Sequence, residues 1–233
     1  MALILSIETS EKTCSVALSN NYELISTLEI YEEKSHAAKL TVLIDKLFSE
    51  KELDIKKLDA VAVSRGPGSY TGLRIGVSVA KGICYALNIP LIAISTLQLL
   101  CWGLMYSGCL RKYNLDIPDL ILCPLIDARR MEVYKAFFNK NGEQVNEIVA
   151  EIINENSFCN ELVTNKIVFF GSGADKCKNI IKNKNAYFID EIQPNASHMI
   201  SNAYDCYIQK KFEDHAYFEP FYLKDFVATV PKK

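Results

Sequence analysis

The chain has 233 residues, of which 49% are hydrophobic and 23% charged, and it carries 26 lysines and arginines against 28 aspartates and glutamates. These values exclude a disordered or collagen-like chain and are typical of a globular protein. The formal net charge of -2 provides no basic excess. It therefore argues against nucleic-acid binding driven by electrostatics alone, and leaves open RNA contact inside a complex.

Neither a signal peptide nor a membrane span is predicted. The N-terminus lacks a basic region, and Glu8 ends its apolar run early. Polar residues interrupt the most apolar stretch, 91–106, which is shorter than the ~20 residues that a spanning helix needs. The eight cysteines contain no Cys-x-x-Cys pair, and several lie in apolar segments. We therefore expect reduced thiols in a cytoplasmic protein, rather than disulfides or zinc.

Residues 1–90 predict a βββαβα unit. Three strands are expected first, over residues 2–7, 14–19 and 22–31. Ser35 can cap a helix whose apolar residues recur at i, i+3, i+4, i+7 and i+8. These apolar residues are Leu40, Leu43, Ile44, Leu47 and Phe48. A strand over 58–63, a glycine-rich turn and a helix over 71–87 complete the unit.

The same order of elements recurs after a linking strand over 91–94 and a linking helix over 95–107. The strands expected next are 120–126, 132–139, 143–153 and 166–170, followed by a turn at 171–173 and a helix to about residue 182. A last helix over 196–212 and a tail strand over 219–223 are expected to complete the second unit. Aligning Ile7 with Ile126 also pairs Glu8 with Asp127, which supports a duplication.

Two βββαβα units side by side predict an α/β fold with the actin-like ATPase architecture and a reduced second lobe. We expect the first lobe with its linking helix over 1–107, and the second, smaller lobe over 108–233. In this architecture a nucleotide normally lies between the two lobes, so this is where phosphate-binding residues would be expected.

A glycine-rich loop follows the strand over 58–63 and opens the next helix. Backbone N–H groups at a helix start, approached closely because of glycines, can bind an anion or a carboxylate. The loop is not a P-loop, because no Gly-Lys-Ser/Thr follows. It does not match a dinucleotide fingerprint either, and the residues alone favour a structural turn. The loop residues singled out are Gly66, Pro67, Gly68, Ser69, Thr71, Gly72 and Arg74. We expect Gly68 and Gly72 to lie where backbone geometry or close approach excludes a Cβ.

The helix after this loop carries small residues every four positions, at Gly72, Gly76 and Ala80. Each interior glycine costs about 1 kcal/mol of helix stability relative to alanine, so the three glycines Gly72, Gly76 and Gly82 predict that something packs unusually close. Packing within the same domain accounts for part of this surface. We expect the remainder to form, with Leu40, Leu43 and Leu47 of the preceding helix, a docking surface for a partner.

Several segments resemble the TsaB (YeaZ) family, over residues 3 to about 225. They are Ile4-Leu5-Ser6-Ile7-Glu8-Thr9-Ser10, the Ser35-His36 helix start, residues 64–76 around the glycine-rich loop, Ser95-Thr96-Leu97, Ile126-Asp127-Ala128-Arg129-Arg130-Met131-Glu132-Val133-Tyr134 and Pro220-Phe221-Tyr222-Leu223-Lys224. The resemblance implies a cytosolic subunit of the machinery that adds threonylcarbamoyl to the adenosine beside the anticodon of transfer RNAs. It also implies a non-catalytic scaffold that pairs with a metal-bearing paralogue (TsaD) and an ATPase (TsaE). We expect a homodimer when the chain is alone, and contact with tRNA only through the complex.

The histidines do not form a metal site. In the catalytic paralogue a His-x-x-x-His pair binds the metal, but here His36 is followed four residues later by Leu40. His198 and His215 match no ligand spacing. The glycoprotease label often given to this family is therefore poorly supported. We expect His36 to lie at a helix start or an interface, and the partner-binding set to be His36, Leu40, Leu43, Leu47, Gly72, Gly76 and Ala80.

Glu8 and Asp127 occupy the places where actin-like ATPases hold acidic residues near nucleotide phosphates and their metal. Thr9 and Ser10 follow Glu8, in place of a phosphate-binding glycine turn. A second turn, with Gly171 and Gly173, resembles the one that meets adenosine. We expect both carboxylates to cap turns, with no cofactor and no catalysis by the chain alone. Weak binding of ATP or ADP at a subunit interface stays open.

Three functions compete. The scaffold of a tRNA-modifying complex is the leading hypothesis. A freestanding actin-like ATPase or kinase is the second, and it requires measurable turnover of ATP by the purified chain. A metallopeptidase is the third, and it requires a metal site that three scattered histidines do not provide. Arg129 and Arg130 can contact a partner or an RNA phosphate, although most exposed arginine pairs are simply solvated.

Overall fold

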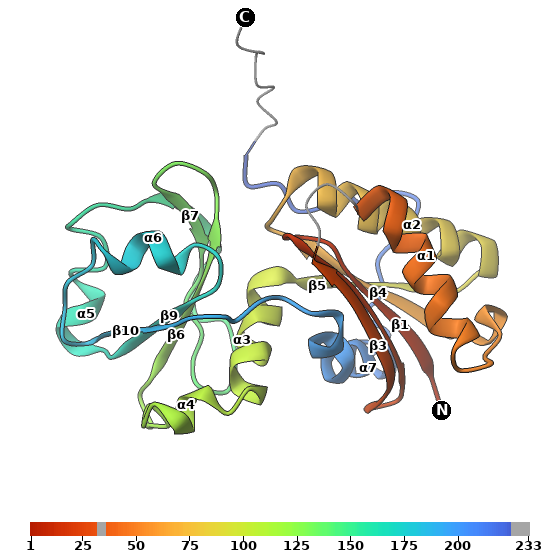
Figure 1. Cartoon of the computed structure of the whole chain (residues 1–233), viewed down its shortest axis with the longest axis horizontal. Helices are drawn as coiled ribbons and strands as arrows, with labels where there is room; N and C mark the ends of the chain where they lie inside the picture. The colour runs from red at the N-terminus through yellow and green to blue at the C-terminus, as the bar shows by residue number, and fades with distance from the viewer. Residues whose placement is uncertain (32–35, 225–233) are drawn as a thin grey trace, which may run out of the picture.

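The computed structural model describes residues 1–31 and 36–224, which form two lobes side by side (Figure 1). The first lobe is built on a five-stranded sheet with the order β3-β2-β1-β4-β5. Its strands are β1 (Leu3–Glu8), β2 (Thr13–Asn20), β3 (Glu23–Tyr31), β4 (Ala60–Gly66) and β5 (Leu91–Ser95). The expected capping residue Ser35 lies outside the described residues.

The second lobe repeats this topology. Its strands are β6 (Ile121–Asp127), β7 (Glu132–Lys135), β8 (Val149–Ile152), β9 (Ile167–Phe170) and β10 (Ala186–Ile189), and they follow the order β8-β7-β6-β9-β10. In both lobes the first strand pairs antiparallel with the second and parallel with the fourth. The predicted duplication and the actin-like architecture are confirmed.

Helices cover both faces of the first sheet. Helices α1 (His36–Ser49) and α2 (Tyr70–Leu87) pack on one face, and a short 3-10 helix, η1 (Ile55–Lys57), precedes β4. The other face is covered by α3 (Thr96–Tyr106), η2 (Ala196–Met199) and α7 (Ile200–Ile208). The second lobe carries only short helices, α4 (Cys109–Lys112), α5 (Glu161–Thr164) and α6 (Ala174–Lys178). Its reduced size agrees with the prediction.

The chain returns to the first lobe near its end, which corrects the expectation that residues after 195 complete the second lobe. The Ala196 N–H donates to Ser15 Oγ (2.9 Å), and the Glu213 N–H donates to the Leu91 carbonyl oxygen (2.9 Å). The expected tail strand over 219–223 is not formed, although the Phe221 N–H donates to the Arg65 carbonyl oxygen (2.7 Å). The second lobe is therefore an insertion between two parts of the first.

Local sequence signals explain the ends of α2. Ser69 Oγ accepts a hydrogen bond from the Gly72 N–H (3.2 Å), as an N-cap serine does. Asn88 ends the helix in the left-handed conformation, at φ 53°. In the described residues, no helix is long and apolar enough to span a membrane.

Candidate functional site

The glycine-rich loop packs against the turn that follows β1. Because β1 and β4 are parallel neighbours, their carboxyl ends meet at the same edge of the sheet. The Ser69 N–H donates to the Ser10 carbonyl oxygen (2.6 Å). A Cβ on Gly68 would lie 2.5 Å from that same oxygen, and a Cβ on Gly72 would lie 2.1 Å from the Thr9 carbonyl oxygen. The predicted close approach at both glycines is confirmed, and what approaches is the chain's own backbone.

The small residues of α2 pack within the first lobe, which corrects the expectation that they form a docking surface. Thr9 Oγ1 donates to the Gly72 carbonyl oxygen (2.8 Å), and a Cβ on Gly76 would lie 2.2 Å from Thr9 Oγ1. Ala80 is fully buried. The close approach expected at Gly82 is wrong: of the three glycines inside α2, it alone faces open space, with nothing within 4 Å of a Cβ built there. A Gly76→Glu substitution would therefore disturb the fold rather than probe an interface.

The remaining members of the partner-binding set also lie inside the lobe. Leu40, Leu43 and Leu47 belong to the core between α1 and the sheet, because the helix turns its apolar stripe inward. His36 is buried at the start of α1, and its Nε2 has no hydrogen-bond partner among the described residues. These side chains give no surface to a partner. Val42 lies on the opposite, exposed side of α1, and 58% of it is exposed.

Glu8 and Asp127 have equivalent roles in the two lobes. Glu8 Oε1 accepts a hydrogen bond from the Ser10 N–H (2.5 Å), two residues further on. Asp127 Oδ1 likewise accepts from the Arg129 N–H (2.7 Å). Each carboxylate therefore caps the turn after the first strand of its lobe, as the sequence predicted. Glu8 is completely buried, and burial raises the pKa of its carboxyl group.

The two lobes are joined by a residue that the sequence analysis did not single out, Glu11. Ser172 Oγ donates to Glu11 Oε1 of the first lobe and accepts from the Asp127 N–H (3.0 Å) of the second. Burial is the main cause that raises the pKa of Glu11 to about 7; the hydrogen bond from Ser172 opposes it, and the charges of Glu8 and Asp127 reinforce it. Lys176 Nζ lies 2.5 Å from Asp127 Oδ1. The interlobe position is thus occupied by the chain's own acidic groups.

The two glycines of the second-lobe turn pack within that lobe. The Gly173 N–H donates to the Leu125 carbonyl oxygen (2.8 Å), and a Cβ on Gly171 would lie 2.6 Å from that same oxygen, so both glycines pack on β6. Within residues 1–31 and 36–224, no three His, Cys, Asp or Glu side chains are grouped to hold a metal ion.

The last described residues lie along α2 beside the glycine-rich loop. Arg74 Nε donates to the Tyr222 hydroxyl (3.1 Å), and its guanidinium lies 4.1 Å from the centre of the Tyr70 ring. Lys81 Nζ donates to the carbonyl oxygens of Ala216 (3.2 Å) and Phe218 (3.0 Å). Arg74 therefore anchors the C-terminal segment.

A family model described as TsaD: tRNA N6-adenosine threonylcarbamoyltransferase matches residues 31–232. The chain is 29% identical over 234 residues to the tRNA threonylcarbamoyladenosine biosynthesis protein TsaB of Haemophilus influenzae, covering 97% of this chain and 94% of that one. It is 27% identical to the TsaB of Escherichia coli, covering 97% and 96%. The chain belongs to this family, in its TsaB (YeaZ) branch. The solved structure of YeaZ from Pseudomonas aeruginosa has the same fold, with a TM-score of 0.78 at 24% identity, covering 96% of this chain and 100% of that one.

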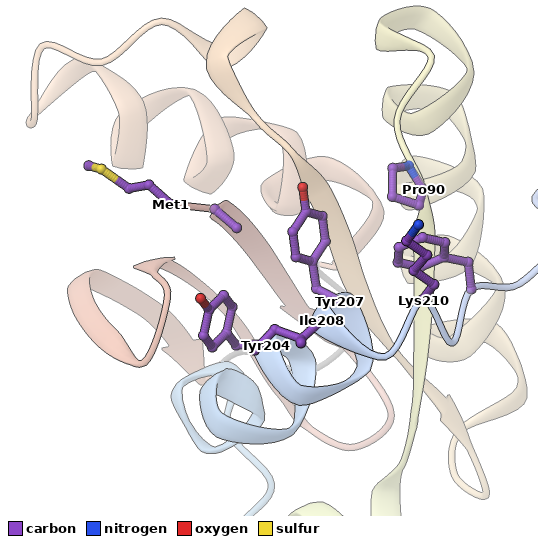
Figure 2. Close-up of a pocket in the computed structure, with 8 residues that line it drawn as sticks. Met1, Pro90, Tyr204, Tyr207, Ile208 and Lys210 are labelled. Carbon is purple, nitrogen blue, oxygen red and sulfur yellow. The ribbon is translucent and has the colours of Figure 1, made fainter.

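A cavity of about 400 Å³ in this TsaB-family chain lies away from the glycine-rich loop (Figure 2). It is lined by Met1, Pro90 and the α7 side chains Tyr204, Tyr207 and Ile208, among others. Met1 precedes β1 and Pro90 precedes β5. The cavity therefore lies at the amino ends of the parallel strands, whereas sheets of this kind bind ligands at the carboxyl ends.

Proposed function

We propose that this TsaB-family chain is the scaffold or activating subunit of the complex that adds threonylcarbamoyl to the adenosine next to the anticodon of tRNAs. It acts in the cytoplasm, with a TsaD-type catalytic paralogue and a TsaE-type ATPase as partners. It reaches tRNA through the complex, and pairs with itself when the paralogue is absent. The observation that carries the proposal is the match to the TsaD family along residues 31–232, on a chain whose interlobe position is filled by its own acidic side chains.

The exposed side of α1 and α2 is the surface that we expect to meet the paralogue. The leucines of α1 face the core of the first lobe and are not part of this surface. On the exposed side, Val42 of α1 is 58% exposed, and Gly82 of α2 has nothing within 4 Å of an added Cβ. A TsaD-type paralogue that shares this fold would carry an equivalent pair of helices. Two such pairs can pack about an approximate two-fold axis, and the same geometry would serve a homodimer.

The variant Val42→Glu is expected to abolish capture of the paralogue and modification of tRNA while leaving the fold intact. A charge that is desolvated at an interface without a partner typically costs several kcal/mol. Co-purification, light scattering and a reconstituted modification assay measure the result. Val163→Glu is the matched control, because Val163 is 74% exposed on α5 of the other lobe. If Val42→Glu binds and supports modification like the parent, the docking surface lies elsewhere.

We expect the isolated chain to hydrolyse no ATP and to retain no divalent metal after dialysis. The expectation follows from Glu8 and Asp127, whose side chains accept hydrogen bonds from their own turns, and from the engaged N–H groups of the loops. Weak binding of ATP or ADP is expected only at a subunit interface. Phosphate release and elemental analysis provide the measurements. Robust hydrolysis that Glu8→Ala or Asp127→Ala abolishes would favour the freestanding ATPase or kinase.

A further inference from the structure

The turn between β6 and β7 carries two adjacent arginines in the left-handed backbone conformation. Arg129 has φ 69° and Arg130 has φ 47°, and both residues are exposed. Glycine and asparagine take this conformation with little strain, whereas other residues rarely adopt it. The turn is nonetheless well defined, because the Ala128 N–H donates to the Glu132 carbonyl oxygen (3.0 Å). A tight turn by itself gives no reason for arginine at either position.

The acidic residues that flank this turn are already neutralised. Asp127 forms an ion pair with Lys176, and Glu132 forms one with Lys224. Lys176 Nζ also donates to the Arg130 carbonyl oxygen (3.0 Å), and this hydrogen bond fixes the backbone of the turn. Within residues 1–31 and 36–224, neither the Arg129 nor the Arg130 guanidinium forms an ion pair or hydrogen bond. The turn therefore presents two unpaired positive charges to solvent.

We propose that the turn at Arg129 and Arg130 contacts the phosphate backbone of the RNA substrate. This inference rests on the proposed function, which supplies RNA as the partner, and it adds a direct contact from this chain. A guanidinium matches a phosphate with two parallel hydrogen bonds. A protein partner is less well suited, because stable protein interfaces have an apolar core and the turn offers only Met131, which is 36% exposed.

The double variant Arg129→Gly/Arg130→Gly separates recognition from stability. Glycine adopts the left-handed conformation without strain, and the backbone N–H of residue 129 can still donate to Asp127 Oδ1. The melting temperature should therefore equal or exceed that of the parent. Binding of unmodified tRNA transcript is measured for the chain alone and with its paralogue, over a range of salt concentrations. We expect affinity to fall about tenfold and the slope of log affinity against log salt to shrink by about 2, or about 1 for each phosphate contact.

Lys56→Ala/Lys57→Ala is the matched control. It removes two exposed positive charges from η1, in the first lobe, and neither lysine forms an ion pair within residues 1–31 and 36–224. This control should bind tRNA like the parent. Equal loss in both variants would show that only net charge matters and would overturn the inference. Unchanged tRNA binding by Arg129→Gly/Arg130→Gly, or loss of the paralogue instead of tRNA, would overturn it as well.

Because binding is measured directly, the inference and the proposed function fail separately. A parent chain that binds tRNA through this turn but supports no modification contradicts the proposed function and keeps the contact. If the double variant supports modification and binds tRNA with the parent's affinity, the result contradicts the proposed contact and leaves the proposed function standing. A parent that binds no tRNA, alone or with the paralogue, also removes it.

Discussion

The variant Gly72→Ala is expected to lose about 3 kcal/mol of unfolding free energy, or to fail to fold. The added Cβ would lie 2.1 Å from the Thr9 carbonyl oxygen. That oxygen belongs to the backbone of the turn after β1, so it cannot move aside as a flexible side chain would. Either α2 must retreat from the sheet or the turn must open. Both movements break the hydrogen bond from Thr9 Oγ1 to the Gly72 carbonyl oxygen.

The same substitution further along α2 should have the opposite sign. Gly82 has nothing within 4 Å of an added Cβ, so Gly82→Ala should stabilise the chain by up to about 1 kcal/mol, because alanine favours a helix more than glycine does. Urea unfolding followed by circular dichroism measures both variants. Similar stability of Gly72→Ala and the parent would show that the turn after β1 does not hold α2 as the structure indicates.

Stability should fall as pH rises through neutrality because of Glu11. Its folded-state pKa is raised from 4.5 to about 7, mainly by burial, so folding favours the protonated carboxyl group. This contribution is complete below about pH 4.5 and is lost as pH rises through 7. By linkage the loss is on the order of 2–3 kcal/mol. Burial raises the pKa of Glu8 as well, which acts in the same direction.

The variant Glu11→Gln tests this assignment. The amide keeps an acceptor for Ser172 Oγ but has no charge to desolvate, so the variant should be more stable than the parent at pH 8 and nearly equal to it at pH 5. Urea unfolding between pH 5 and 8 provides the measurement. Glu155→Gln, on the exposed surface of the second lobe, is the control and should follow the parent. A parent-like pH profile for Glu11→Gln would assign the dependence to other groups.

The fold could be predicted from the sequence where periodicity and turn residues agree. The apolar stripe of α1 and the glycine-rich start of α2 located both helices, and the repeated order of elements predicted the duplication. The second lobe was harder, because its elements are short. Strand β10 has four residues, three of them half-buried, and gives no alternating pattern. The expected strand over 143–153 is reduced to β8, and the helix expected to reach residue 182 ends at Lys178.

The candidate site was predicted by position better than by role. Gly68 and Gly72 were expected at a close approach, but a glycine pattern does not say whether the neighbour is a ligand, a partner or the same chain. The neighbour is Ser10 for Gly68 and Thr9 for Gly72, and Thr9 precedes Gly72 by more than sixty residues. Glu11 could not be found at all, because its importance comes from Ser172 in the other lobe. Contacts between distant segments leave no local pattern in the sequence.

The return of the chain to the first lobe has a consequence for synthesis on the ribosome. The second lobe is one continuous stretch of the chain. One face of the first sheet, in contrast, is covered in part by η2 and α7, which are synthesised after the second lobe. Until residues 196–208 emerge, Ile4, Ala62 and Ile92 on that face lack their final cover. The part of the chain made first is therefore finished last, and its bare sheet face is the surface that a ribosome-associated chaperone would meet.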